Sequence, residues 1–328
     1  MLSVAAPLSL RALAATPSRF AHVASAYEAH GRRHDALFDP SRIDDFLAPE
    51  FLALTSAVAR DPGAARALVR QETREVYSFP MLTAAASEWL IEEVENFRES
   101  GLEARRPNSM NEYGLILNDI GLRPSLDALQ VRVHTLAQAL FAREAANFDS
   151  HHSFIVAYSA DEDAHLDMHT DDSDVTLNVC LGQDFSGAGL TFCGDVGDAD
   201  HRALSHRYSH VPGRALLHLG RRRHGADTIA SGRRVNLIMW NYCKEWRASA
   251  VYRQRGLRYA AEAAVPDALC VSYTHDRDFE AVAGSARPAG HADKAKKAWC
   301  PPKHAEYEGF VGGEGRYAFV DPMHRDLV

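Results

Sequence analysis

The sequence lacks several features that mark common classes of protein. None of its 328 residues belongs to an uninterrupted apolar run of about 18 residues, the length needed to cross a membrane. The formal net charge is −8, so the basic excess of a nucleic-acid-binding protein is missing. No Gly-x-Ser-x-Gly nucleophile elbow is present. We therefore expect neither a membrane-spanning protein, nor a nucleic-acid partner, nor a serine hydrolase of this type.

Cysteine is also scarce, and its five copies have no short paired spacing of the kind that binds zinc or forms a redox dithiol. We interpret them as reduced, mostly buried thiols. With 46% hydrophobic and 24% charged residues, the chain has the composition of a globular protein of one large domain or two.

The first 27 residues contain Arg11 and Arg19, many alanines and serines, and no acidic residue before Glu28. This composition is typical of an organelle transit peptide, and a disordered or helical extension would explain it equally well. We expect a soluble intracellular protein, located in the cytoplasm, or in mitochondria or plastids if residues 1–27 act as a transit peptide.

The hydrophobic pattern changes along the chain. Residues 43–142 have helical spacing, with a break at Pro62 and Gly63. From Phe154 onward, short apolar runs alternate with glycine-rich or polar turns, which predicts a β-sandwich or barrel. The predicted strands are 154–158, 175–181, 190–193, 215–219 and 235–242.

One strand is preceded by a dense cluster of charge in the segment HTDDSDVTLNVCL, residues 169–181. His169 and Asp171 are two residues apart, so an extended backbone would place both side chains on one face. His224 precedes a turn and another apolar strand. Two histidines and one carboxylate leave three positions of a metal open, which suits non-haem Fe(II). A second pair, His165 and Asp167, is the alternative; we favour His169 and Asp171 because they lie directly before the strand.

Arg234 follows His224 by ten residues, on the strand after the turn. Its guanidinium could bind a carboxylate through two hydrogen bonds, as the far end of 2-oxoglutarate requires. Asn178 is a candidate hydrogen-bond partner of the bound oxo-acid. Each residue alone could be an ordinary strand or loop residue, but His-x-Asp, a second His and an Arg, all beside predicted strands, together favour one site.

The segments RPNSMNEYG (106–114), DSHHSFIVAYSADEDAHLDMHTDDSDVTLNVCLGQDFSG (149–187) and HVPGRALLHLGRRRHGADTIASGRRVNLIMW (210–240) resemble the prolyl/lysyl-hydroxylase-type oxygenases. Within that group, the chain looks most like the plant and animal proteins called 2-oxoglutarate and iron-dependent oxygenase domain-containing. The resemblance implies an α+β fold, a double-stranded β-helix (jelly-roll) core with flanking N-terminal helices. It also matches the metal ligands to His169, Asp171 and His224, the 2-oxoglutarate carboxylate partner to Arg234, and two further cosubstrate-binding positions to Tyr158 and Asn178.

The chemistry implied by this resemblance is a dioxygenase reaction. Fe(II) would be the metal, 2-oxoglutarate and O₂ the cosubstrates, and ascorbate the reductant. Decarboxylation of 2-oxoglutarate to succinate would be coupled to hydroxylation of a substrate C–H bond, with a prolyl or lysyl side chain of a protein as one candidate. Oligomeric state is not indicated. The expected organisation is an N-terminal extension (1–40), a helical support region (41–147), the jelly-roll core (148–247) and a C-terminal extension (248–328).

Two other classes of function stay open at this stage. A metal-dependent hydrolase could use the same three ligands with a metal-bound water, and a jelly-roll could act as a binding module without catalysis. The stretch PNSMNEYG could line the entrance to the site, although we favour a turn between helix and sheet. The family usually has two adjacent glycines where this chain has Gly187, Ala188 and Gly189, so the local turn is expected to differ. His218, on a predicted strand, is a candidate core histidine.

Overall fold

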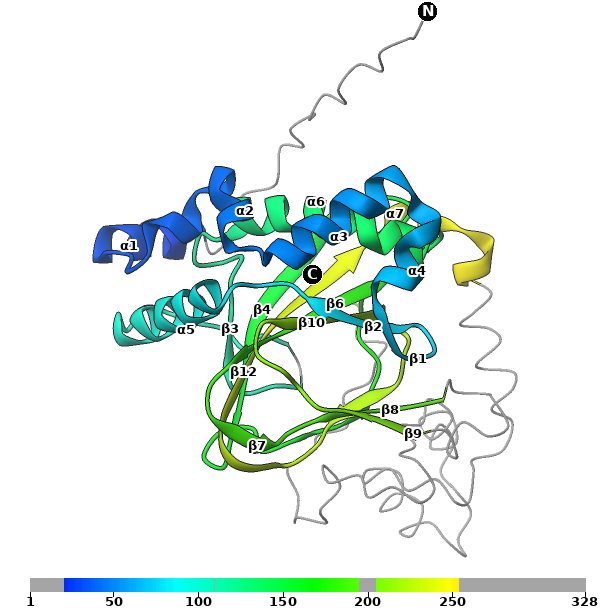
Figure 1. Cartoon of the computed structure of the whole chain (residues 1–328). Coiled ribbons are helices and arrows are strands. Elements are labelled where there is room, and N and C mark those ends of the chain that lie inside the picture. The colour runs from blue at the N-terminus through cyan, green and yellow to red at the C-terminus, as the bar shows by residue number, and fades with distance from the viewer. Residues whose placement is uncertain (1–20, 109, 195–204, 254–328) are drawn as a thin grey trace, which may run out of the picture.

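The computed structural model describes residues 21–108, 110–194 and 205–253 (Figure 1). In these ranges two antiparallel sheets face each other, and the helices lie on the outer side of the larger sheet. No helix in this part of the chain is long and apolar enough to cross a membrane. The sheets and helices form the double-stranded β-helix with flanking helices that the sequence predicted.

The helices come mainly from the first half of the described chain. They are α1 (Ala21–His30), α2 (Ile43–Phe46), α3 (Pro49–Arg60), α4 (Ala65–Leu68), α5 (Ala84–Glu99), α6 (Arg123–Leu140) and α7 (Lys244–Ala248). The strands are β1 (Arg70–Thr73), β2 (Val76–Pro80), β3 (Gly114–Ile116), β4 (Ser150–Ser159), β5 (Leu166–His169), β6 (Val175–Gly182), β7 (Phe185–Gly187), β8 (Leu190–Cys193), β9 (Ser205–Tyr208), β10 (Arg214–Leu219), β11 (His224–Ala226) and β12 (Ile229–Tyr242).

The larger sheet has the strand order β1-β2-β10-β6-β12-β4-β3, with β7 paired to β12. The smaller sheet has the order β5-β11-β8-β9. Strands far apart in sequence are therefore neighbours: β6 lies between β10 and β12 in the larger sheet, and β11 pairs with β5 in the smaller one. The pairing of β5 with β11 in the smaller sheet brings residues 169 and 224 together, although they are far apart in sequence.

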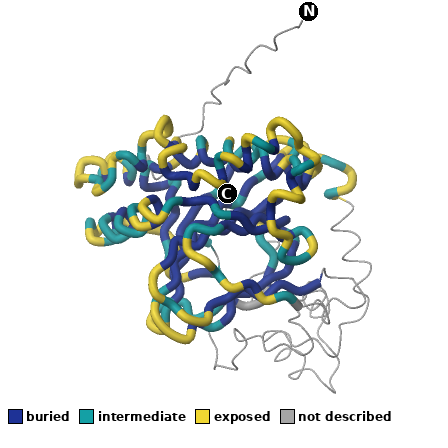
Figure 2. Tube along the Cα trace, in the orientation of Figure 1, coloured by how far each residue is buried: buried dark blue, intermediate teal, exposed yellow. Residues whose placement is uncertain are grey.

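Side-chain alternation divides the core in two. On β6, Leu177 and Val179 belong to the cluster shared with the helices, whereas Thr176 and Asn178 point to the opposite face, toward the smaller sheet. A second apolar cluster, which includes Phe154, Tyr158 and Phe192, fills the space between the sheets. Figure 2 shows the strands and the sheet-facing sides of the helices as buried. Polar residues of β6 are consequently enclosed between two sheets.

Helix α6 confirms the helical pattern predicted after Pro124. Its first turn contains that proline, where the missing amide hydrogen costs no hydrogen bond. The buried face of the helix carries Leu126, Leu129, Val133, Leu136 and Leu140. The five predicted strands are also present, within a few residues of the expected limits.

The prediction that residues 43–142 are helical was wrong in two places. Residues 70–80 form the hairpin of β1 and β2, and residues 114–116 form β3. In β2, residues 76–79 are buried on both faces, because Tyr77 and Phe79 belong to the cluster shared with the helices and Val76 belongs to the cluster between the sheets. Such a short strand shows no polar alternation, and one of its two pairing partners, β10, is distant in sequence.

Part of the expected N-terminal extension belongs to the folded unit. Val23 and Tyr27 of α1 are buried in the main core. The Tyr27 hydroxyl donates to the buried carboxylate of Glu93 on α5, which also accepts from the backbone N–H groups of Arg33 (3.1 Å) and His34 (2.7 Å). This carboxylate therefore fastens residues 27–34 to α5. The proposed transit peptide falls mostly on residues 1–20, which lie outside the described residues.

We expect Glu93→Ala to lower the free energy of unfolding by about 3 kcal/mol, because one hydroxyl and two backbone N–H groups would lose their acceptor. Denaturant unfolding followed by circular dichroism measures this loss. Glu88→Ala, at an exposed position on the same helix, is the matched control and should change stability little. An equal effect of the two substitutions would show that Glu93 does not fasten the N-terminal segment.

Candidate metal and oxo-acid site

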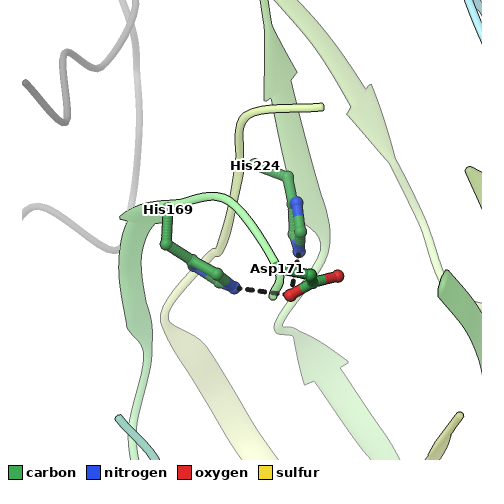
Figure 3. Close-up of side chains that lie close together, drawn as sticks. All are labelled: His169, Asp171 and His224. Carbon is green, nitrogen blue, oxygen red and sulfur yellow. Dashed lines mark ion pairs between the residues drawn. The ribbon is translucent and has the colours of Figure 1, made fainter. Parts of the chain in front are cut away.

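Three predicted ligands converge between the sheets. His169 is the last residue of β5, His224 is the first residue of β11, and the two are paired in register. Asp171 Oδ1 lies 3.5 Å from His169 Nε2 and 3.8 Å from His224 Nε2. Figure 3 shows both rings and the carboxylate pointing toward one another. One atom from each residue can be chosen so that all three lie within 4.8 Å of one another.

The donor set and its spacing fit a divalent transition metal. An ion about 2.1 Å from each ligand atom holds those atoms about 3.0–3.4 Å apart, so small side-chain shifts would close the site. The side chains of His169, Asp171 and His224 are only 7%, 5% and 6% exposed. Two imidazoles and one carboxylate on one side of an ion leave the other side open for exchangeable ligands, as in non-haem iron sites.

Asp171 reaches the cluster by a route that differs from the one expected. It lies beyond the end of β5, in the connection to β6, so strand alternation does not place it beside His169. Its backbone N–H donates to the carbonyl of Gly220 (2.9 Å), while the Thr176 hydroxyl donates to its Oδ2 (2.6 Å). A Cβ at Gly220 would lie 2.1 Å from the carbonyl oxygen of Ser173. Only a glycine at position 220 therefore lets the connection between β5 and β6 pack so closely.

The cluster favours an ionised Asp171 carboxylate beside a neutral His224 imidazole. Burial opposes the charge on Asp171, but the nearby imidazoles of His224 and His169 outweigh it and hold the pKa of Asp171 well below its usual range. Burial, reinforced by repulsion from His169, lowers the pKa of His224 to about 3. A carboxylate anion and a neutral imidazole are the forms that bind metals.

His218 is a buried neighbour of the predicted metal ligands. It is 0% exposed, its Nδ1 donates to the Leu219 carbonyl (3.0 Å), and its Nε2 lies 3.9 Å from Asp171 Oδ2. Burial lowers the pKa of His218, so it adds no positive charge to the site. Its ring packs edge-on against His224 and Phe192. His218 therefore supports the cluster from the larger sheet, in agreement with its expected place in the core.

The structure describes only part of the alternative pair, His165 and Asp167. His165 lies in the connection before β5 and is half-buried, outside the group of three ligand side chains found in the described part of the chain. The side chain of Asp167 lies outside the described residues. The structure thus brings together the favoured set and does not describe a site at the upstream pair.

Arg234 is enclosed in the same interior. It lies on β12 opposite Tyr158 of β4, is 2% exposed, and its guanidinium carbon lies 4.3 Å from the centre of the Tyr158 ring. Its NH1 donates to the backbone carbonyl of Ala188, and its Nε has no hydrogen-bond partner. Among residues 21–108, 110–194 and 205–253, no carboxylate forms an ion pair with it. A buried guanidinium in this state is expected to bind an anion.

Ala188 stands where the family usually has a glycine. Its φ of 49° is in the left-handed region, which an alanine rarely adopts, and Gly187 before it has φ 75°. The turn nevertheless presents the Ala188 carbonyl to Arg234. The departure from the family pattern is therefore accommodated by a strained alanine, and the arginine stays in place.

The other two predicted cosubstrate residues also face the interior. Asn178 is 7% exposed, and its side-chain oxygen accepts a hydrogen bond from Asn236 (2.6 Å). The Tyr158 hydroxyl accepts from Asn111 (3.2 Å), and burial raises the pKa of Tyr158. The phenol is therefore neutral and keeps its own proton for donation. Tyr158 packs against the Arg234 guanidinium, and Asp171 is near enough to influence the pKa of Tyr158.

The PNSMNEYG stretch is an irregular connection between α5 and β3, as the favoured prediction held. It is tied to the sheet through Asn111, whose amide donates to Tyr158 and to Asp163 Oδ2 (3.2 Å each). Tyr113 is 41% exposed. The connection thus supports the Tyr158 side chain from behind; a contact with substrate stays a prediction.

The sequence did not indicate the roles of three residues of this interior. Thr176 holds Asp171, and Asn236 and His210 lie near Arg234; His210 was considered only as one of several possible metal positions. A signal for Asn236 was present, because alternation along β12 places it on the same face as Arg234. No comparable signal exists for His210, which follows β9 in an irregular connection. Only the packing of that connection onto β12 shows its place.

Comparison with known sequences gives the family. A family model described as the OGFOD2-like domain matches residues 25–145. The human 2-oxoglutarate and iron-dependent oxygenase domain-containing protein 2 is 36% identical over 243 residues, which are 71% of this chain and 67% of that protein. The chain belongs to the family of 2-oxoglutarate and iron-dependent oxygenase domain-containing proteins.

Other members of the oxygenase-domain family agree with this. The CP2 protein of Arabidopsis thaliana is 38% identical over 200 residues, covering 58% of this chain and 49% of the relative. The chain thus spans about half to two thirds of the length of the curated relatives it matches. Among solved structures, the prolyl hydroxylase of Trichoplax adhaerens, in complex with a hypoxia inducible factor peptide fragment, is 14% identical. It covers 60% of this chain and 94% of its own with a TM-score of 0.44.

The hydrogen bond from Thr176 predicts a measurable effect on metal binding. Thr176→Val removes the donor from Asp171 Oδ2 and should weaken binding of Co(II) or Fe(II) by about 10-fold or more. Thr176→Ser keeps the hydroxyl and should restore most of the affinity. Isothermal titration calorimetry with both variants tests this; equal metal affinity in Thr176→Val and the unaltered protein would contradict the assigned role.

Proposed function

We propose that this protein is a 2-oxoglutarate- and Fe(II)-dependent dioxygenase. One observation carries the proposal: a buried guanidinium without a carboxylate partner shares an enclosed interior with a buried group of two histidines and an aspartate. A metal-dependent hydrolase would need the three ligands but has no use for Arg234. A cosubstrate that chelates a metal at one end and carries a carboxylate at the other needs both.

Each residue has a distinct task in this proposal. His169, Asp171 and His224 would hold the metal, and bound Fe(II) supplies the activation of O₂ that C–H hydroxylation requires. Arg234 would bind the distal carboxylate of 2-oxoglutarate through a fork of two N–H groups. The Tyr158 hydroxyl and the Asn178 amide would donate to oxygens of the same molecule. The facing sheets would keep bulk water away from the reacting atoms.

Charge balance supports the assignment. The Asp171 carboxylate lies near the neutral imidazole of His224. Arg234 is a buried positive charge that Asp227 attracts, but no carboxylate in the described part of the chain forms an ion pair with it. Removing such a charge from water is costly unless an anion replaces the lost hydration. A dicarboxylate that spans the interior would supply negative oxygens to the guanidinium and, at its other end, to the metal.

The substrate is proposed only as a class. Hydroxylation of a prolyl or lysyl side chain in a protein rests on the resemblance to the prolyl/lysyl-hydroxylase type alone, and so does ascorbate as the reductant that keeps iron ferrous. The reaction would convert 2-oxoglutarate and O₂ to succinate and CO₂ and would place one oxygen atom in the substrate C–H bond. A fold of this kind accommodates many substrates, so the substrate must be found experimentally.

The experiment that tests the proposal is a measurement of succinate formed from 2-oxoglutarate by the Fe(II)-loaded protein, with and without candidate peptides. We expect turnover in the unaltered protein and a loss of at least 100-fold in His169→Ala, because two ligands hold iron poorly. His165→Ala is the matched control and should retain turnover. Retained turnover in His169→Ala combined with loss in His165→Ala would move the site upstream, and metal-dependent hydrolysis without succinate formation would favour the hydrolase.

A further inference from the structure

A histidine outside the proposed ligand set lies against Asn236 of β12, near Arg234. His210 follows β9 in the connection to β10, and its ring packs edge-on against Tyr208, the last residue of that strand, with 5.4 Å between the ring centres. The residue as a whole is half-buried, but its Nε2 atom is buried and has no hydrogen-bond partner. A buried ring nitrogen without a partner indicates a ligand atom that the protein itself does not supply.

The neighbouring amides determine which nitrogen of His210 carries the proton. Asn236 Nδ2 donates one hydrogen to Asn178 Oδ1 (2.6 Å), and the same amide nitrogen lies 3.4 Å from His210 Nδ1. An amide nitrogen can only donate, so Nδ1 acts as the acceptor. In a neutral imidazole, the proton is then on Nε2. The unpartnered atom of His210 is therefore a donor.

Burial keeps this imidazole neutral. Burial is the main cause that lowers the pKa of His210 well below its usual value, and repulsion by the Arg234 guanidinium adds to it. His210 and Arg234 are thus near enough to influence each other, yet two donors cannot satisfy one another. Both need the same partner, an anion with several acceptor positions, and a carboxylate offers about four lone-pair sites.

We propose that His210 is a second anchor for the distal carboxylate of 2-oxoglutarate, donating a hydrogen bond from Nε2 while Arg234 binds the same carboxylate. This inference rests on the proposed function and deepens it. The consequence is selectivity: two kinds of donor at the far end of the site would favour a dicarboxylate oxo-acid over an oxo-acid of the same length that ends in a methyl group.

Isothermal titration calorimetry with the full-length, Mn(II)-loaded protein under anaerobic conditions tests this without turnover. The two ligands are 2-oxoglutarate and 2-oxopentanoate, which differ only in the distal group. His210→Phe keeps the ring shape and removes the donor, so we expect its affinity for 2-oxoglutarate to fall by about 10- to 100-fold, the range of a hydrogen bond to a charged group. Its affinity for 2-oxopentanoate should stay unchanged.

Two further variants complete the design. His206→Phe places the same substitution on β9, the edge strand of the smaller sheet, where His206 lies near Glu72 of β1. This variant should bind both ligands as the unaltered protein does. His210→Gln restores an N–H donor and should recover most of the lost affinity. If His210→Phe gives no native circular dichroism spectrum, His210→Leu replaces it, with the same expected loss.

The outcomes separate this inference from the proposed function. Unchanged 2-oxoglutarate affinity in His210→Phe, together with a large loss in Arg234→Ala, would overturn the role of His210 and leave the proposed function intact. Equal weakening of both oxo-acids in His210→Phe would also overturn it, because the effect would not depend on the distal carboxylate. Absence of 2-oxoglutarate binding by the unaltered, metal-loaded protein would instead contradict the proposed function.

Discussion

The proposed site depends on one buried charge, the guanidinium of Arg234. It is held on β12 above the ring of Tyr158, in the space between two sheets, without an acidic partner in the described part of the chain. A folded protein can keep such a charge in place only at a cost in stability, which the surrounding core must offset. An anionic ligand that binds the guanidinium would offset this cost. The same interior contains a buried cluster of metal-ligand type, and a molecule that joins the two ends explains both.

The fold separates the supporting core from this polar interior by strand alternation. Leu177, Val179 and their counterparts on neighbouring strands pack against the helices, and this larger apolar cluster keeps the β6–β12 face rigid. The opposite side of the same strands can then carry Thr176, Asn178 and Arg234. Helices α1 and α5 extend the support, since the Glu93 carboxylate binds the backbone before α2. The apolar cluster between the larger sheet and the helices therefore supports the polar residues on the opposite face of that sheet.

The sequence predicted the longer elements and the ligand types because both leave local signals. β6 and α6 are long enough to show their periodicities, and His-x-Asp, His and Arg lie beside predicted strands. The strands β3, β5 and β11, with three or four residues each, show no alternation long enough to be recognised. Asp171 is placed by hydrogen bonds to Gly220 and Thr176 rather than by a strand, and His210 by the packing of an irregular connection. These contacts join residues far apart in sequence, so they appear only in the folded structure.

The most direct test of the central claim is an anaerobic titration of the Fe(II)-loaded protein with 2-oxoglutarate, followed by visible absorbance. Chelation of iron by the oxo-acid should produce a metal-to-ligand charge-transfer band in the unaltered protein. The band should require much more 2-oxoglutarate in Arg234→Lys, because a point charge replaces a bidentate fork. Arg233→Lys, at a position that forms partly buried ion pairs with Glu162 and Glu95, should titrate like the unaltered protein. Absence of the band in folded, iron-loaded protein would contradict the account, as would identical titrations of all three proteins.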